Sequence, residues 1–122
     1  MTLHVLPQAF TVCQISDLSG IDFTRKFVFV AKTDEEVSLV CETEFVPQNT
    51  LSREDGWRAF RVQGVLEFSL VGVLAELSGI LAAAGISIFA VSTYNTDYLL
   101  TRAEVFDRAL RLLADSGYAI LE

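Results

Sequence analysis

The chain has 122 residues, 52% of them hydrophobic, and a formal net charge of −7 at pH 7. This length can bury one core or two small lobes, so a multidomain enzyme with long linkers is not expected. The negative charge disfavours nucleic acid and anionic lipid as partners. No apolar run approaches the roughly 20 residues that cross a membrane. The start at Met1 has no signal-peptide pattern, so we expect a cytoplasmic protein.

The first part of the chain predicts a β-rich lobe over residues 1–55 with little helix. Strands are expected in three segments rich in apolar and β-branched residues, 9–15, 27–32 and 37–41. Between them, residues 17–24 fit only a short helical turn or a loop. Residues 45–55 contain Pro, Asn and Ser and are expected to form a connection. Cys13 and Cys41 lie in the strand-like runs, too far apart for a metal or redox motif, and are expected to be reduced core residues.

The second part, residues 56–122, has clearer periodicity. Apolar side chains alternate with polar ones over 57–68, as in a half-buried strand. Ser69 is a candidate N-cap for a helix over 71–84, in which apolar residues recur at helical spacing and Gly85 supplies the stop. Gly79 lies inside this helix and is expected to permit a close helix contact.

The remaining elements complete the pattern. Residues 86–93 read as a central strand, and 98–100 as its short hairpin partner. The spacing of Thr101 and Glu104 predicts a capping box for a helix that ends at Gly117, before a last strand over 118–121. The order βαββαβ predicts an α+β fold in which two helices cover one face of an antiparallel sheet, the ferredoxin-like arrangement.

The two parts share a weak internal repeat. A constant offset pairs Phe29 with Phe89, Thr33 with Thr93 and Leu39 with Leu99. These pairs fall mainly on the proposed hairpin, which suggests that the first lobe is a degenerate copy of the second.

Little in the sequence suits catalysis. His4 is the only histidine, and a Ser-His-Asp or Cys-His device needs a histidine beside its nucleophile. Acidic pairs such as Glu42 with Glu44 lie in polar, turn-like surroundings, where solvated carboxylates are expected. The glycines form no phosphate-binding pattern. We predict no enzyme, no catalytic residue, no metal and no cofactor. A small isomerase on the same fold is a remote alternative that needs a pocket carboxylate with a strongly raised pKa.

Two segments are candidates for a binding site. The loop at 67–72 contains Ser69, Leu70, Val71 and Gly72 and leads into a helix N-terminus, whose free N–H groups suit a carboxylate. The polar run Thr93-Tyr94-Asn95-Thr96-Asp97 offers hydroxyls and a carboxylate, which suit an ammonium group. Together they describe a receptor for a zwitterion. The alternative is that Ser69 is only a cap and the polar run only a hydrogen-bonded turn.

The stretch FSLVGVLAELSGILAAAGISIFAVSTYNTDYLL, residues 68–100, resembles the amino-acid-binding ACT domain. The similarity is to the branch that includes cytosolic arginine sensors of the TORC1 pathway and short bacterial stand-alone proteins. It covers residues 58–121. The earlier VAKTDEEVSLVCE resembles the β-rich first lobe of those proteins, and Gly56-Trp57-Arg58 resembles the start of their second lobe.

The resemblance implies a non-catalytic regulatory sensor that binds an amino acid across a lobe or dimer interface. It implicates Leu70, Gly72, Thr93, Tyr94, Thr96 and Asp97. Asp97 would receive the ligand's cation, and backbone groups near Gly72 its carboxylate. Position 70 is Leu where the arginine-binding lobe has an acidic residue, so the ligand is not named. One complete lobe cannot supply both walls, so we expect a homodimer and a regulated protein partner. The alternative is a ligand-free assembly module on the same fold.

Overall fold

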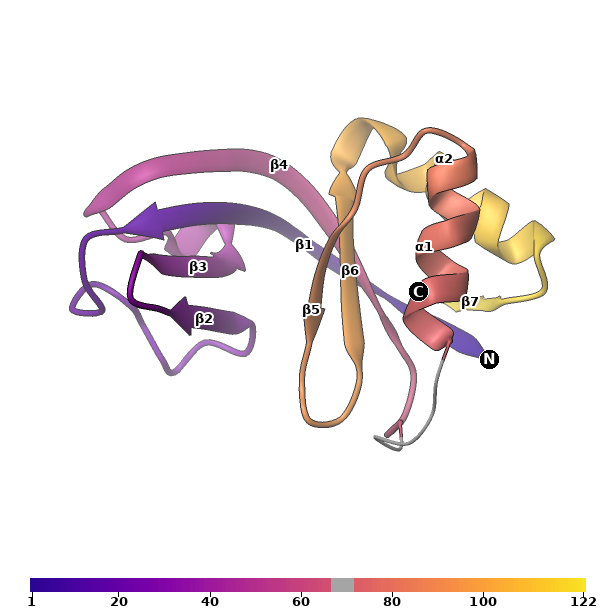
Figure 1. The fold of residues 1–122 in the computed structure, drawn as a ribbon, viewed down its shortest axis with the longest axis horizontal. Coiled ribbons are helices and arrows are strands. Elements are labelled where there is room, and N and C mark those ends of the chain that lie inside the picture. The colour runs from indigo at the N-terminus through magenta and orange to yellow at the C-terminus, as the bar shows by residue number, and fades with distance from the viewer. Residues whose placement is uncertain (67–71) are drawn as a thin grey trace. The chain divides into compact units, whose positions relative to one another are not determined.

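The computed structural model describes residues 1–66 and 72–122 and shows an α+β protein (Figure 1). The elements in chain order are β1 (Thr2–Ile15), β2 (Val28–Lys32), β3 (Val37–Glu42), the 3-10 turn η1 (Thr43–Phe45), β4 (Thr50–Val62), α1 (Val73–Ala83), β5 (Phe89–Ser92), β6 (Asp97–Arg102), α2 (Ala103–Asp115) and β7 (Ala119–Leu121). Among the described residues, no helix is long and apolar enough to cross a membrane.

The chain divides into two compact units. The C-terminal unit consists of Met1–Pro7 and Arg58–Glu122, and the N-terminal unit consists of Gln8–Trp57. Strands β1 and β4 therefore each contribute residues to both units. The predicted division of the chain into domains at residue 55 stays a prediction.

In the C-terminal unit the strand order is β7-β1-β4-β6-β5. The predicted βαββαβ order is present along the chain as β4, α1, β5, β6, α2 and β7. The start of β1 is added between β4 and β7, where Thr2–His4 runs parallel to Ala119–Leu121. Met1–Pro7 was predicted to belong to the other lobe, because no local pattern shows which sheet a short strand joins.

The core of the C-terminal unit lies between the sheet and the two helices. Leu77 and Leu81 of α1 and Phe106 of α2 are almost fully buried against Phe60 of β4 and Leu99 of β6. Full burial of one such side chain contributes about 1.5–3 kcal/mol. Figure 1 shows α1 and α2 beside each other in this unit. The core therefore fixes both helices on one face of the sheet.

The ends of the two helices differ from the sequence predictions. Helix α1 begins at Val73 with Gly72 as its N-cap residue. The capping box predicted for α2 is wrong: the helix starts at Ala103, and the Thr101 hydroxyl donates to the carbonyl of Arg102. The N-cap residue is Arg102, and no side chain caps this helix end.

The exposed side of α1 is built from small residues. Ala75, Gly79 and Ala82 are exposed, whereas Leu77 and Leu81 face the core. The predicted close helix contact at Gly79 is wrong within the described chain, since a Cβ added there would meet no atom within 4 Å.

In the N-terminal unit the strand order is β2-β3-β1-β4. The predicted connection over 45–55 is partly wrong, because η1 occupies its start and β4 begins at Thr50. The first part of β4 is almost entirely exposed, so it has no apolar alternation that sequence analysis could detect. Pairing with β1, and not burial of side chains, makes this segment a strand.

The small core of the N-terminal unit contains both cysteines. Cys13 and Cys41 are buried free thiols that pack with Ile15 and Leu39. Burial raises the pKa of the Cys41 thiol to about 11 and also raises that of Cys13. Both groups therefore stay protonated at neutral pH, as expected for core residues and not for reactive thiolates.

Candidate functional site

A cavity of about 320 Å³ lies in the C-terminal unit between the start of α1 and the β5–β6 turn. It is lined by Leu66, Gly72, Val73, Leu74, Ala75, Ser92, Thr93, Tyr94, Asn95, Thr96 and Asp97. The structure thus brings together the predicted site residues Gly72, Thr93, Tyr94, Thr96 and Asp97. The predicted residues Ser69, Leu70 and Val71 lie outside the described residues.

The threonine hydroxyls on this turn are engaged within the protein. The Thr93 hydroxyl donates to the Thr96 carbonyl at 3.0 Å and accepts from the Thr96 N–H at 3.4 Å. The Thr96 hydroxyl donates to the carbonyl of Val62 in β4 at 2.8 Å, and Thr96 is only 6% exposed. Their role in the structure is therefore to shape the turn and attach it to β4. This part of the predicted site behaves as the turn hypothesis expected.

A second attachment holds the tip of the turn. The Leu66 N–H, just beyond the end of β4, donates to the Asn95 carbonyl at 2.7 Å. Both attachments come from one neighbouring segment, so the turn is positioned before any ligand arrives. Preorganisation of this kind reduces the entropy that binding costs.

Asp97 supplies the negative charge of the cavity. It is the first residue of β6 and pairs in register with Ser92, whose hydroxyl donates to Asp97 Oδ1 at 2.6 Å. The Ser92 contact orients the carboxylate and engages one of its two oxygens. A carboxylate accepts several hydrogen bonds, so capacity for an ammonium group remains.

The start of α1 supplies the opposite polarity. Gly72 has φ +89° and provides no side-chain cap, and the first helical hydrogen bond runs from the Glu76 N–H to the Gly72 carbonyl at 2.8 Å. The N–H groups of Val73, Leu74 and Ala75 precede that bond, and these residues line the cavity. Amide groups at a helix N-terminus attract an anion.

Several lining residues were not predicted from the sequence. Val73, Leu74 and Ala75 read as ordinary helix positions, and their N–H groups matter only because the helix starts there. Ser92 lies opposite Asp97 in the hairpin, whereas the prediction had placed Asp97 in the turn. That register depends on the turn length, which the polar run alone does not fix.

The fold and this cavity, at the entry to the first helix and the end of a strand hairpin, describe a small α+β binding module. A family model described as ACT domain matches residues 52–115, more than half of the chain. The protein therefore belongs to the ACT domain family, whose members are in general small-molecule-binding regulatory modules.

Two solved structures are similar in fold to this chain. A protein from Agobacterium tumefaciens is 31% identical with a TM-score of 0.86, and the match covers 98% of this chain and 91% of that chain. A Vibrio cholerae protein of unknown function is 19% identical with a TM-score of 0.73, over 93% of this chain and 88% of that chain.

The regulatory subunit of aspartate kinase from Thermus thermophilus is similar in fold. Its identity is 11% and its TM-score 0.67, over 96% of this chain and 97% of that chain. No curated protein sequence matches the chain.

Proposed function

We propose that the protein is a non-catalytic regulatory module that binds an amino acid in the cavity between the start of α1 and the β5–β6 turn. One observation carries this proposal: a single cavity is lined both by the first turn of α1 and by the carboxylate of Asp97. An amino acid carries a carboxylate and an ammonium group a few atoms apart. The two ends of the cavity therefore match the two charges of such a ligand.

The family and the structural relatives support a regulatory role. ACT domains bind small molecules in regulatory proteins, and one structural relative is the regulatory subunit of aspartate kinase. Binding would act on this protein by favouring one packing of its surfaces over another. A regulated protein partner would then respond to that difference.

Further parts of the proposal concern assembly and location. We expect a homodimer that closes the open side of the cavity, and a cytoplasmic protein. The similarity of the TYNTD segment to the arginine-sensor branch makes arginine one ligand to include. Leu70, the position at which this chain departs from that branch, lies outside the described residues.

The first experiment is a thermal-shift screen against the twenty amino acids at millimolar concentration. A ligand at one hundred times its dissociation constant adds about 2.7 kcal/mol to the free energy of unfolding. Asp97→Asn should remove the shift produced by the selected amino acid. Asp107→Asn is the matched control, since it makes the same charge change at an exposed position on α2 away from the cavity. A ligand shift that is equal in both variants would refute the contact with Asp97.

A second candidate function is a ligand-free assembly module. The internal hydrogen bonds of Thr93 and Thr96 favour it, because they leave fewer side-chain groups for a ligand. A groove of about 650 Å³ also follows the small residues of α1, including Ala75, Gly79 and Ala82. A flat response to all amino acids, together with a stable dimer in sedimentation velocity, would favour this function.

A further inference from the structure

Apolar side chains form part of the wall of the proposed amino-acid cavity, between the start of α1 and the β5–β6 turn. Leu66, Val73 and Leu74 each pack partly against the core of the C-terminal unit and also line this cavity. Ala75 adds a methyl group to the same lining. Contact between two apolar surfaces is favourable because both lose their exposure to water. These walls therefore favour a hydrocarbon side chain on the ligand.

The hydroxyl groups along the β5–β6 turn are engaged within the protein. The hydroxyls of Ser92, Thr93 and Thr96 each donate to an acceptor in the hairpin or in β4. Asn95 also lines the cavity, from the exposed tip of the turn. A polar ligand side chain that needs a donor would compete with these existing hydrogen bonds, and breaking one of them costs free energy. An apolar side chain leaves all of them intact.

The charges of the cavity also restrict the ligand. Among the described residues that line it, Asp97 is the only carboxylate and none is Lys, Arg or His. The ammonium group common to all amino acids would already use Asp97. A cationic or acidic ligand side chain would then lose water without gaining an ionic partner from these residues, which costs free energy. The charges therefore favour an uncharged ligand side chain.

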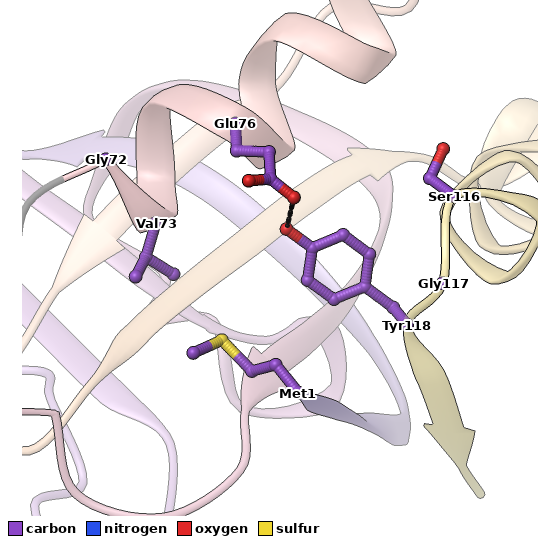
Figure 2. Close-up of a pocket in the computed structure, with 7 residues that line it drawn as sticks. All are labelled: Met1, Gly72, Val73, Glu76, Ser116, Gly117 and Tyr118. Atoms are coloured by element: carbon purple, nitrogen blue, oxygen red, sulfur yellow. Dashed lines mark hydrogen bonds between the residues drawn. The ribbon is translucent and has the colours of Figure 1, made fainter.

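The carboxylate in the first turn of α1 belongs to a different cavity. This second cavity, of about 350 Å³, shares Gly72 and Val73 with the first, so the two cavities share the start of α1. Figure 2 shows the Tyr118 hydroxyl donating to Glu76 Oε1, at 2.5 Å. Partial burial, together with this hydrogen bond to a carboxylate, raises the pKa of Tyr118 to about 12, so the donor keeps its proton at neutral pH. Glu76 is therefore bonded to Tyr118 and does not line the amino-acid cavity.

We propose, on the basis of the proposed amino-acid site, that this site selects an amino acid with an uncharged aliphatic side chain. Asp97 binds the ammonium group, and the first amides of α1 bind the carboxylate. Leu66, Val73 and Leu74 contact the aliphatic chain. The cavity volume of about 320 Å³ lies at the lower end of the range for ligand pockets, roughly 300–1,000 Å³, which suits a single amino acid.

The test compares two ligands, L-norleucine and L-lysine. They have the same straight carbon chain, and lysine carries an additional ammonium group at its end. NMR titrations of the ¹⁵N-labelled protein give both dissociation constants, and we expect saturable shifts at the amides of Leu74 and Thr93. L-norleucine should bind about tenfold more tightly than L-lysine, since the second ammonium group gains no carboxylate. L-alanine should also bind at least about tenfold more weakly than L-norleucine, because each methylene in an apolar pocket contributes on the order of tenfold.

Variants of Leu74 test which wall contacts the ligand side chain. Leu74→Glu supplies a carboxylate at the second residue of α1, where the positive end of the helix tolerates it. This variant should shift the ratio of the two dissociation constants about tenfold or more towards L-lysine, because the additional ammonium group gains a partner. Leu74→Gln is the matched control, with a similar shape and no charge, and should change the ratio much less. An unchanged ratio in Leu74→Glu would overturn the assignment of Leu74 to this wall.

The remaining outcomes distinguish the side-chain selectivity from the amino-acid site itself. If L-lysine or L-arginine binds more tightly than L-norleucine, and Asp97→Asn removes that binding, the aliphatic selectivity is overturned and the amino-acid site is supported. If none of these ligands gives saturable shifts, both are overturned. A preference for L-norleucine that disappears in Asp97→Asn supports both. L-norleucine binding that is unchanged in Asp97→Asn would overturn the ammonium contact but support the apolar wall.

Discussion

The β2–β3 and β5–β6 hairpins have the same turn hydrogen bonds and different surroundings. In β2–β3, Lys32 pairs with Val37, and the Thr33 N–H donates to the Glu36 carbonyl at 2.9 Å. In β5–β6, Ser92 pairs with Asp97, and the Thr93 N–H donates to the Thr96 carbonyl at 2.8 Å. The threonine hydroxyl accepts a backbone N–H in both turns. The weak sequence repeat thus falls on two structurally equivalent turns.

The difference between the hairpins lies in the side chains around that common turn. Position 97 is an aspartate, whereas its equivalent, position 37, is Val. Thr96 attaches its turn to β4 through a buried hydroxyl, whereas the equivalent Glu36 is exposed. The first turn of α1 faces the second hairpin across a cavity. Of the two equivalent turns, the β5–β6 turn is the candidate site, because the α1 N-terminus and the Asp97 carboxylate lie beside it.

The largest expected effect concerns the two equivalent core leucines. Leu99→Ala should lower the free energy of unfolding by about 3–5 kcal/mol, and Leu39→Ala by about 2–3 kcal/mol. Leu99 packs in the larger cluster between sheet and helices, and Leu39 in the small cluster with Cys13 and Cys41. Urea unfolding of both variants measures the difference. Equal losses would show that the two cores support their hairpins equally.

The next effect concerns the attachment of the turn. Thr96→Val should cost about 1–3 kcal/mol, because it removes the buried donor to the Val62 carbonyl. Glu36→Gln at the equivalent exposed position should change stability by less than about 0.5 kcal/mol. Chemical denaturation can compare both variants with the parent protein. A neutral Thr96→Val would mean that this hydrogen bond does not hold the turn.

A smaller effect should appear at alkaline pH in the C-terminal unit. The pKa of Tyr118 is raised from 10.0 to about 12 in the folded state. A raised pKa gives stability that is complete below pH 10 and disappears as pH rises through about 12. The stability difference between the parent protein and Tyr118→Phe should therefore shrink between these pH values. Thermal unfolding at pH 8 and pH 11.5 measures it, and a constant difference would contradict the role of the Glu76 contact.

The smallest effect is expected at acid pH in the N-terminal unit. The hydrogen bond from Thr11 at 2.7 Å, and then the contact with Arg53, lower the pKa of Asp55 below 3.8. A lowered pKa gives stability that is present above pH 3.8 and is lost as pH falls through the folded-state pKa. Asp55→Asn should therefore be less stable than the parent protein at pH 6 but not at pH 2. A difference that persists at pH 2 would indicate another cause.

Much of the fold could be predicted from local patterns. The helical spacing of Leu77 and Leu81 predicted a helix that the structure contains. The apolar run 86–93 was predicted as a central strand, which is wrong in position: β5 covers Phe89–Ser92 and lies at the edge of the sheet. The start of β4 was missed because its residues are exposed. The capping box was wrong because the N-cap residue of α2 is Arg102, one position after Thr101. Local patterns report which side chains are apolar. They do not show which strand segments pair with each other.

The candidate site also has features that the sequence predicts and features that only the structure shows. The polar run at Thr93–Asp97 was visible in the sequence, and the structure places it at a turn that lines a cavity. Whether each hydroxyl was available could not be predicted, since Thr96 bonds to Val62, which is distant in the chain. The pairing of Glu76 with Tyr118 could likewise not be predicted, because it joins the first helix to the connection between α2 and β7.

By itself, then, the sequence determined the α+β element order, the family resemblance and the chemical character of the turn, because these depend on residue type and spacing along the chain. Only the tertiary structure decided that β1 joins β7, which of the polar side chains are engaged internally, and that two cavities share the start of α1. The physical reason is that burial, hydrogen-bond pairing and cavities arise between residues distant in the chain. No local sequence pattern specifies which of these residues lie close together in the folded protein.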